Sequence, residues 1–202
     1  MTKIKLCGLA RTEDILTANE LMPEYIGFVF APKSRRAVTR EKAEDLRARL
    51  APGILAVGVF TDSPPEIVAE MLESGLLDLA QLHGHEDEQY IARLRELTEK
   101  PIIRAFRVTC RDDAQEAHRS SADFILLDAG AGEGRTFAWE LAEGIRRPYF
   151  LAGGLTPENA ASALEHLRPY ALDVSSGIET GGKKDPIKMR AFVNAARRRT
   201  KR

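Results

Sequence analysis

The stretch Leu151-Ala152-Gly153-Gly154-Leu155, followed one helix later by Asp173-Val174-Ser175-Ser176-Gly177, decides the fold of this chain. Each stretch is a short apolar run that ends in small residues, whose backbone amides are left free. In an eight-stranded (β/α) barrel, the loops after strands seven and eight commonly form a phosphate site. Glycine allows the backbone to approach phosphate oxygens, and a helix that begins there adds amide donors and a favourable dipole. The two stretches therefore predict a barrel that binds a phosphorylated small molecule, with its candidate contacts at Gly153, Gly154, Ser175, Ser176 and Gly177.

Outward from these stretches, apolar segments alternate with amphipathic segments along the whole chain. Continuous apolar runs are typical of strands buried in a parallel sheet. The predicted strands are Ile4–Cys7, Tyr25–Phe30, Leu55–Phe60, Leu79–Leu82, Ile102–Phe106, Phe124–Leu127, Tyr149–Ala152 and Ala171–Val174. The predicted helices are Thr12–Leu21, Thr39–Leu50, Pro65–Ser74, Glu86–Leu97, Asp112–His118, Phe137–Ile145, Pro157–Leu167 and Pro186–Ala196, the seventh of them capped by Thr156.

Eight strand–helix units predict the α/β class and a single (β/α)8 TIM barrel. Alternation requires a parallel sheet, and right-handed crossovers place each helix outside it. A doubly wound open sheet is the alternative arrangement of the same units. Because no Pro-, Gly- or Ser-rich linker divides the chain, we expect one barrel domain over residues 1–202.

The composition is that of an ordinary globular protein, with 44% hydrophobic and 30% charged residues. Thirty basic residues balance thirty acidic ones, so the overall charge gives no indication of nucleic-acid binding. The locally basic segment 197–202 is interpreted as a solvated end, with a nucleic-acid-binding arm as the alternative. Two cysteines form no disulfide framework. We find neither a signal-type apolar core at the N-terminus nor a run long enough to span a membrane. We therefore expect a cytoplasmic protein without nucleic-acid or membrane partners.

Cys7 and Asp128 are the candidate catalytic residues, because each ends a predicted strand at the functional face of a barrel. Strands one and six are three steps apart in a ring of eight, so their ends face each other across the mouth. One titratable group on either side of a bound molecule is the arrangement that proton transfer needs. Taken alone, Cys7 is also consistent with a small buried core residue and Asp128 with a helix cap.

Three further features lie at the same predicted face. Arg36 belongs to a basic cluster with Lys33 and Arg35, which predicts a carboxylate or phosphate partner or else a solvated turn. His83 follows strand four and is a candidate ligand contact or a rim histidine with structural hydrogen bonds. The glycine-rich segment 129–136 is interpreted as a lid or a long connection; no Gly-Lys-Ser/Thr follows its glycines, so it does not match a P-loop.

Seven blocks of sequence, in the same order from end to end, resemble the phosphoribosylanthranilate isomerase family. They are Lys5-Leu6-Cys7-Gly8, Gly27 to Phe30 with Pro32 to Arg36, Val57 to Phe60, Gln81-Leu82-His83-Gly84, Leu126-Leu127-Asp128, Ala152 to Leu155 with Pro157 to Asn159, and Asp173 to Glu179. The resemblance implies a (β/α)8 barrel of tryptophan biosynthesis that uses no metal and no organic cofactor. It also implies a phosphosugar–anthranilate substrate and a monomer or homodimer.

The family reaction is an Amadori rearrangement of N-(5-phosphoribosyl)anthranilate. By this resemblance, Asp128 aligns with the general acid that protonates the ring oxygen, and Cys7 with the general base that removes the C2′ proton. Arg36 aligns with the residue that binds the anthranilate carboxylate, and Gly154, Ser175 and Ser176 fall in the phosphate loops. The chain departs from the family pattern at Ala31 and Ala37, where aromatic residues are common, and in segments 132–135 and 137–139.

Rival functions differ at identifiable residues. The related isomerase of histidine biosynthesis is expected to have aspartate where Cys7 stands, and indole-glycerol-phosphate synthase needs a lysine at a strand end, which no predicted strand provides. A catalytically silent phosphate-binding module is the alternative from another class. The presence of both Cys7 and Asp128 favours the isomerase over it.

Overall fold

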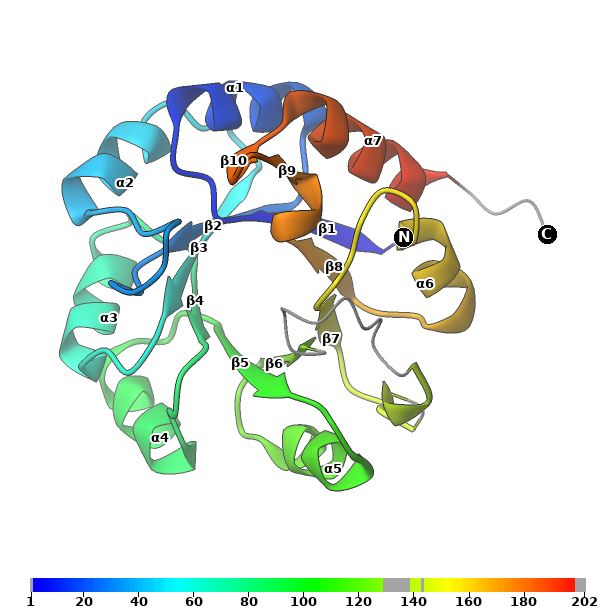
Figure 1. Ribbon diagram of the computed structural model, residues 1–202. Helices are drawn as coiled ribbons and strands as arrows, with labels where there is room; N and C mark the ends of the chain where they lie inside the picture. The colour runs from blue at the N-terminus through cyan, green and yellow to red at the C-terminus, as the bar shows by residue number, and fades with distance from the viewer. Residues whose placement is uncertain (1, 129–138, 143, 199–202) are drawn as a thin grey trace.

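Eight parallel strands close into a barrel in the computed structural model, which describes residues 2–128, 139–142 and 144–198 (Figure 1). The strands are β1 (Lys3–Cys7), β2 (Tyr25–Val29), β3 (Leu55–Phe60), β4 (Leu79–Leu82), β5 (Ile102–Arg107), β6 (Phe124–Asp128), β7 (Tyr149–Ala152) and β8 (Ala171–Val174). Each strand pairs with the next, and β1 closes the ring by pairing with β8 from Lys3↔Ala171 to Leu6↔Val174. The predicted barrel is confirmed, and the alternative of an open sheet is wrong.

Helices surround the barrel on its outside, as right-handed crossovers require (Figure 1). They are α1 (Thr12–Leu21), α2 (Arg40–Arg47), α3 (Pro65–Glu73), α4 (Glu88–Leu97), α5 (Arg111–Arg119), α6 (Ala160–His166) and α7 (Pro186–Arg197). Two short 3-10 helices, η1 (Trp139–Ala142) and η2 (Ser176–Ile178), and a small hairpin of β9 (Glu179–Thr180) and β10 (Lys183–Lys184) complete the described elements. Within the described ranges, no helix has the length and apolar character needed to cross a membrane.

Several predicted helices differ from the observed ones in their bounds: the second ends at Arg47 rather than Leu50, and the fourth begins at Glu88 rather than Glu86. The sixth and seventh predicted helices differ further. In place of the helix predicted over Phe137–Ile145, the described residues form the single 3-10 turn η1, and Gly144 follows with a φ of 93° that ends helical geometry. The seventh predicted helix, observed as α6, begins at Ala160 rather than Pro157, and Thr156 is not its cap. The Asn159 side chain instead accepts a hydrogen bond from the Thr156 amide and donates one to the Gly154 carbonyl, which makes a turn before the helix.

The barrel interior is layered, because alternate residues of each strand point inward. Its amino-terminal part is apolar and aromatic, built mainly from Tyr25, Val57, Leu79, Ile103, Leu126 and Phe150. A second and larger apolar core lies between the strands and the helices. Toward the carboxyl ends of the strands the interior becomes polar, with Lys5, Gln81 and Asp173 all buried. The apolar layer thus forms the floor of the barrel interior, below a polar layer and the mouth of the barrel.

Candidate active site

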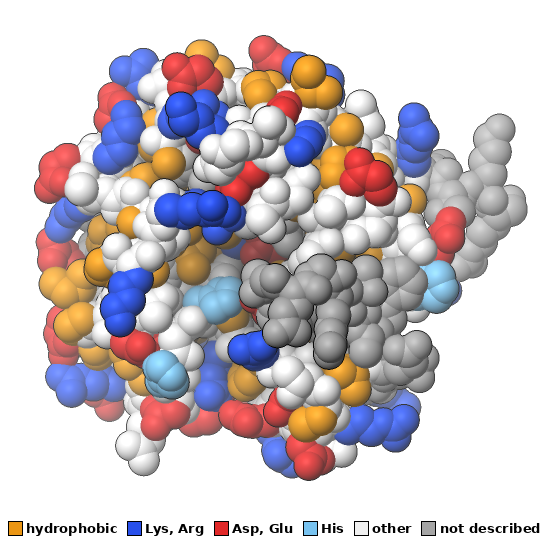
Figure 2. Space-filling model, in the orientation of Figure 1, with side chains coloured by type: hydrophobic (Ala, Val, Ile, Leu, Met, Phe, Trp, Pro, Cys, Tyr) orange, Lys and Arg blue, Asp and Glu red, His pale blue; other side chains and the backbone are white. Residues whose placement is uncertain are grey.

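A cavity of about 290 Å³ opens at the carboxyl ends of the strands. The predicted site residues that line it are Cys7, Arg36, His83, Asp128, Gly153, Gly154, Ser175 and Ser176. Cys7 comes from β1 and Asp128 from β6, so the closed ring does bring the two strand ends to one cavity. Seen from this side, acidic and basic side chains are interspersed around the rim of the molecule (Figure 2).

Gly177 is the one predicted site residue that is not among the residues lining this cavity. A Cβ atom at this position would lie 1.9 Å from the carbonyl oxygen of Leu155. The missing side chain therefore lets η2 pack directly against the loop after β7, which brings the two loops of the predicted phosphate site together. A contact between Gly177 itself and a ligand stays a prediction.

The Cys7 thiol lies in a tight space at the end of β1. Gly27 is its register partner on β2, and a Cβ there would come within 2.7 Å of the sulfur, so only glycine leaves room for the thiol. Cys7 is 8% exposed. Burial raises the pKa of the thiol, and the ammonium groups of Lys5 and Lys184 act in the opposite direction. The thiol is thus buried against the cavity and held close to positive charge.

Asp128 ends β6 with its side chain 18% exposed, and it lies next to His83. Nε2 of His83 is 3.4 Å from Oδ2 of Asp128. On the other side of the ring, Nδ1 of His83 is 2.8 Å from the amide nitrogen of Gln81. His83, a predicted site residue, therefore belongs to a side-chain network that extends from Gln81 to Asp128.

The polar layer beneath the cavity contains functional candidates that the sequence analysis missed. The Lys5 ammonium is 0% exposed and donates to Asp173 Oδ2 at 2.8 Å and to Gln81 Oε1 at 2.7 Å. The other oxygen of Asp173 is buried and has no hydrogen-bond partner among the described residues. The signal that could have identified this group is a single charged or amide residue inside each of the predicted strands Ile4–Cys7, Leu79–Leu82 and Ala171–Val174.

A second charged group holds Arg36 at the rim. Its guanidinium donates two hydrogen bonds to Glu179, at 2.6 and 2.9 Å, and Lys184 donates to the same carboxylate at 2.8 Å. Burial tends to raise the pKa of Glu179, but the hydrogen bonds from Arg36 and Lys184 outweigh it and lower that pKa. The Lys184 ammonium also donates to the carbonyl and hydroxyl oxygens of Ser175. Neither Glu179 nor Lys184 was singled out in the sequence, because their hairpin follows the last barrel strand.

The loops after β7 and β8 have the backbone geometry expected of an anion site. Gly153 and Gly154 have φ values of 86° and 64°, which favour glycine, and Ser175 and Ser176 face the same cavity from the start of η2. The Ser175 hydroxyl also donates to the carbonyl of Cys7 at 3.2 Å. Small residues at two adjacent strand ends allow backbone amides to approach and hold a phosphoryl group.

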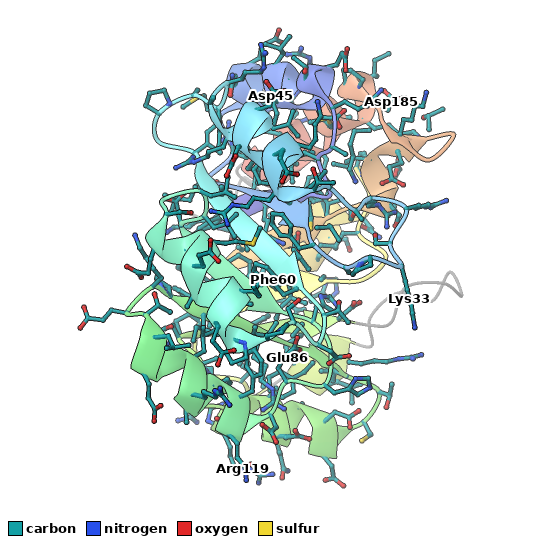
Figure 3. All side chains as sticks on the ribbon, turned by 90° about the vertical axis from the view of Figure 1, so that its left-hand side faces the viewer. Lys33, Asp45, Phe60, Glu86, Arg119 and Asp185 are labelled. Atoms are coloured by element: carbon teal, nitrogen blue, oxygen red, sulfur yellow. The ribbon has the colours of Figure 1, made fainter. Side chains whose placement is uncertain are left out.

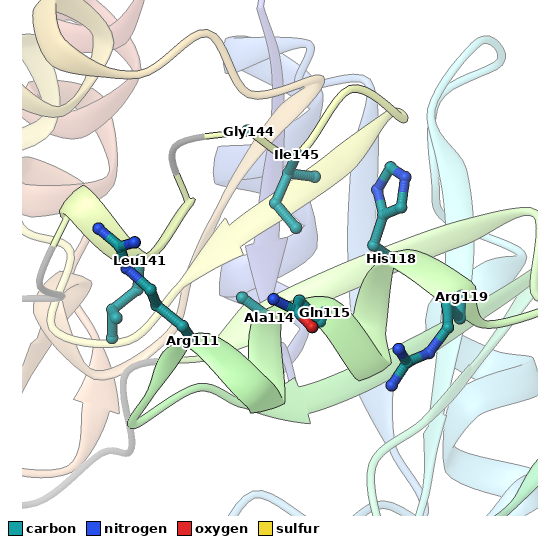
Figure 4. A pocket seen from close by; sticks show the side chains of 8 residues that line it. All are labelled: Arg111, Ala114, Gln115, His118, Arg119, Leu141, Gly144 and Ile145. Atoms are coloured by element: carbon teal, nitrogen blue, oxygen red, sulfur yellow. The ribbon is translucent and has the colours of Figure 1, made fainter.

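Other predicted or possible sites lie away from this cavity. Of the basic cluster, Lys33 and Arg35 are exposed, and Lys33 projects from the loop after β2 into solvent (Figure 3). A wider cavity of about 600 Å³ lies outside the barrel, between α5 and the residues Leu141, Gly144 and Ile145 (Figure 4). The α5 side chains that line it include Arg111, Gln115 and His118. None of the predicted site residues lines that cavity. The predicted glycine-rich segment 129–136 lies outside the described residues.

Across the described ranges, no three His, Cys, Asp or Glu side chains are grouped so that they could hold a metal ion. The polar groups that line the barrel cavity are a thiol, an arginine, a histidine, a glutamine, two carboxyl groups, hydroxyl groups and backbone amides. This set suits an organic anion and proton transfer.

Comparison with known proteins adds a family assignment to this geometry. The sequence model of the family described as N-(5′-phosphoribosyl)anthranilate (PRA) isomerase matches residues 4–195 of the chain. The chain belongs to the PRA isomerase family. This assignment confirms the resemblance seen in the sequence blocks, and it agrees with the closed eight-stranded barrel.

Relatives of the PRA isomerase family match over nearly the full length. The N-(5′-phosphoribosyl)anthranilate isomerase of Endomicrobium trichonymphae is 42% identical over 202 residues, which cover 98% of this chain and 99% of the relative. A solved phosphoribosyl anthranilate isomerase in complex with reduced 1-(o-carboxyphenylamino)-1-deoxyribulose 5-phosphate superposes with a TM-score of 0.87 at 36% identity, covering 97% and 98% of the two chains. Monomers of the dimeric enzyme from Thermotoga maritima superpose with a TM-score of 0.85 at 34% identity, with 97% and 98% coverage.

Proposed function

We propose that this chain converts N-(5-phosphoribosyl)anthranilate into 1-(2-carboxyphenylamino)-1-deoxyribulose 5-phosphate, the Amadori rearrangement of tryptophan biosynthesis. The observation that carries the proposal is one cavity at the strand ends lined by a thiol, a carboxyl group, an arginine and two small-residue loops. Membership of the PRA isomerase family supports the same reaction. The chain acts as a monomer or homodimer.

The substrate is oriented by its two anionic ends. The phosphate binds to backbone amides and hydroxyls at the ends of β7 and β8, which belong to Gly153, Gly154, Ser175 and Ser176. Arg36 binds the anthranilate carboxylate, a pairing for which the planar guanidinium is well shaped. Fixing both ends leaves the ribose ring between Cys7 and Asp128.

Ring opening is the first step, and Asp128 is its general acid. The carboxylic acid donates its proton to the ring oxygen as the bond between C1′ and that oxygen breaks. The lone pair of the anthranilate nitrogen forms the C1′=N bond, so the intermediate is an iminium cation. His83 beside Asp128 then faces the carboxylate that remains.

Cys7 is the general base of the second step. Its thiolate removes the C2′ proton, the C–H electrons form a C1′=C2′ bond, and the iminium electrons return to nitrogen. The resulting enolamine becomes the ketone by moving a proton from the hydroxyl at C2′ to C1′. Burial raises the pKa of the thiol, whereas a nearby cation stabilises a thiolate, so the iminium itself favours the deprotonated base at the moment it is needed.

A fluorescence assay tests the proposed function. The purified chain is mixed with freshly generated phosphoribosylanthranilate, and loss of the substrate's fluorescence is followed. We expect turnover by the unmodified chain, and a fall in kcat of about 100-fold or more for both Cys7→Ser and Asp128→Asn, since acid–base groups contribute that much.

Two matched variants serve as controls. Cys110→Ser and Asp112→Asn change the same residue types at exposed positions near the start of α5 and should leave the rate unchanged. An inactive unmodified chain would indicate a silent binding module. A near-normal rate for Cys7→Ser or Asp128→Asn would remove that residue from the mechanism.

A further inference from the structure

Lys5 is the most unusual residue of the polar layer, because its ammonium group is fully buried inside the barrel. An isolated buried charge costs a great deal of free energy, so a buried lysine needs partners that satisfy it. Lys5 has two, the Asp173 carboxylate at 2.8 Å and the Gln81 amide oxygen at 2.7 Å. The pair with Asp173 neutralises the charge, whereas the contact with Gln81 satisfies a second N–H group and continues through the Gln81 side chain to His83.

The direction of each hydrogen bond beyond Lys5 follows from its chemistry. An ammonium group can only donate, so the oxygen of the Gln81 amide must face Lys5 and its NH2 group must face His83. That NH2 group also only donates, and it lies 2.8 Å from Nδ1 of His83. Nδ1 therefore accepts, and a neutral imidazole then carries its proton on Nε2, the nitrogen 3.4 Å from Asp128.

Lys5 also acts directly on Cys7. The two residues are separated by one position on β1, so both side chains point into the barrel. The Lys5 ammonium stabilises the thiolate and partly offsets the rise that burial causes in the thiol pKa. The other charged groups that face the thiol are Asp173, which opposes Lys5, and Lys184 and Arg36 at the rim.

We propose that Lys5 is the positioning residue shared by both halves of the acid–base pair, an inference that rests on the proposed function. Its charge stabilises the thiolate form of Cys7. Its hydrogen bond to Gln81 fixes His83 as the Nε2–H tautomer, whose N–H group faces Asp128. When Asp128 has donated its proton, its carboxylate faces the Nε2–H group of His83, a hydrogen-bond donor whose direction is fixed. One buried ammonium thereby connects the β1 and β6 sides of the cavity.

The first test is spectroscopic and needs no turnover. Long-range 1H–15N correlation spectra identify the tautomer of each histidine ring, and a His83→Asn variant assigns the His83 signals. We expect the Nε2–H form for His83 in the unmodified chain and loss of that preference in Gln81→Leu, which keeps the Lys5–Asp173 pair. An Nδ1–H form in the unmodified chain, or an unchanged tautomer in Gln81→Leu, would overturn the inference.

The second test measures thiol titration and kinetics in a Cys110→Ser background, so that Cys7 is the only cysteine. We expect Lys5→Met to raise the pH at which the thiolate absorbs near 240 nm. We also expect kcat to fall about 10- to 100-fold with KM changed less than about 2-fold, as for residues that orient a functional group. Gln81→Leu should lower kcat alone and leave the thiol titration unchanged.

Lys3→Met is the matched control, because Lys3 lies on the same strand and face but contacts Tyr25 and Tyr170 at the other end of the barrel. It should leave the thiol titration, the His83 tautomer and kcat unchanged. Equal effects of Lys3→Met and Lys5→Met would reduce Lys5 to a structural residue and overturn the inference. Expected spectra together with an inactive unmodified chain would instead overturn the proposed function, so the two failures are distinguishable.

Discussion

Arg36 illustrates how single residues set the properties of the cavity rim. Glu179 holds its guanidinium through two hydrogen bonds, and the buried Lys184 shares the same carboxylate. Arg35 also lies 3.7 Å from this carboxylate, with its side chain 69% exposed. The cations therefore outnumber the one anion, and the net positive charge at the rim attracts a substrate carboxylate. Gly8 packs against the arginine stem, since a Cβ there would lie 2.6 Å from Cδ of Arg36. The guanidinium is therefore held in place rather than free to sample rotamers.

We expect Arg36→Ala to raise KM for phosphoribosylanthranilate by roughly 10- to 150-fold, because a hydrogen bond to a charged group contributes about 1.5–3 kcal/mol. The effect on kcat should be smaller, as binding is lost equally in the ground and transition states. Steady-state kinetics measure both constants. The matched change Arg35→Ala, at an exposed neighbour that does not line the cavity, should leave KM unchanged. An unchanged KM for Arg36→Ala would assign Arg36 to the surface.

At the scale of elements, the start of helix α4 shows how capping and loop contacts position a strand end. Helix α4 begins after Asp87, whose carboxylate accepts a hydrogen bond from the Tyr90 amide at 2.9 Å. The loop before it carries His83. The Glu86 carboxylate in that loop accepts hydrogen bonds from the amides of Asp62 and Gly84, both at 2.7 Å. Capping and loop contacts together hold the carboxyl ends of β3 and β4 next to each other.

Loss of the α4 cap gives a defined change in stability. Asp87→Ala should lower the free energy of unfolding by about 1 kcal/mol, within the usual range of about 0.5–2 kcal/mol for removal of a capping side chain. Urea unfolding followed by circular dichroism measures the difference. Glu96→Ala removes a carboxylate from the exposed last turns of the same helix and should be neutral or slightly stabilising. Equal losses for the two variants would contradict a capping role for Asp87.

At the scale of the whole molecule, the aromatic floor of the barrel connects β2 with strands β6 to β8 on the other half of the ring. The Phe150 ring lies 5.5 Å from Tyr25, 5.8 Å from Phe124 and 5.6 Å from Tyr170, centroid to centroid. Phe150 is fully buried and comes from β7, whereas its neighbours come from β2, β6 and the residue just before β8. A loss of packing at Phe150 therefore removes contacts to strands in both halves of the barrel.

We expect Phe150→Ala to lower the free energy of unfolding by about 3–5 kcal/mol, the usual cost of emptying a buried phenylalanine site. The urea midpoint should fall while the slope of the transition is kept, as in a change of stability within one cooperative unit. Ile187→Ala removes a large apolar side chain that is 80% exposed and should change the midpoint little. A small effect of Phe150→Ala would show that the floor relaxes into the vacated space.

Much of the candidate site was predictable because the order of the strands in the sequence determines their positions around a closed barrel. Cys7 and Asp128 could be assigned to one mouth from the number of strands between them, and the glycine and serine loops from their place after strands seven and eight. Residues whose partners depend on exact register could not be assigned. Lys5 and Asp173 become partners only because β1 pairs with β8 at that register, and Arg36 meets Glu179 across 143 positions of sequence.

The sequence by itself determined the eight strand–helix units, since strands buried on both faces need continuous apolar runs and helices need an amphipathic period. It also determined the chemical groups available at the strand ends. Only the tertiary structure decided how those groups are connected. These connections include the hydrogen bonds from Lys5 through Gln81 to His83 and those from Arg36 to Glu179. The physical reason is that local patterns specify which face of an element is buried, whereas closure of the ring specifies which buried polar groups lie within hydrogen-bond distance.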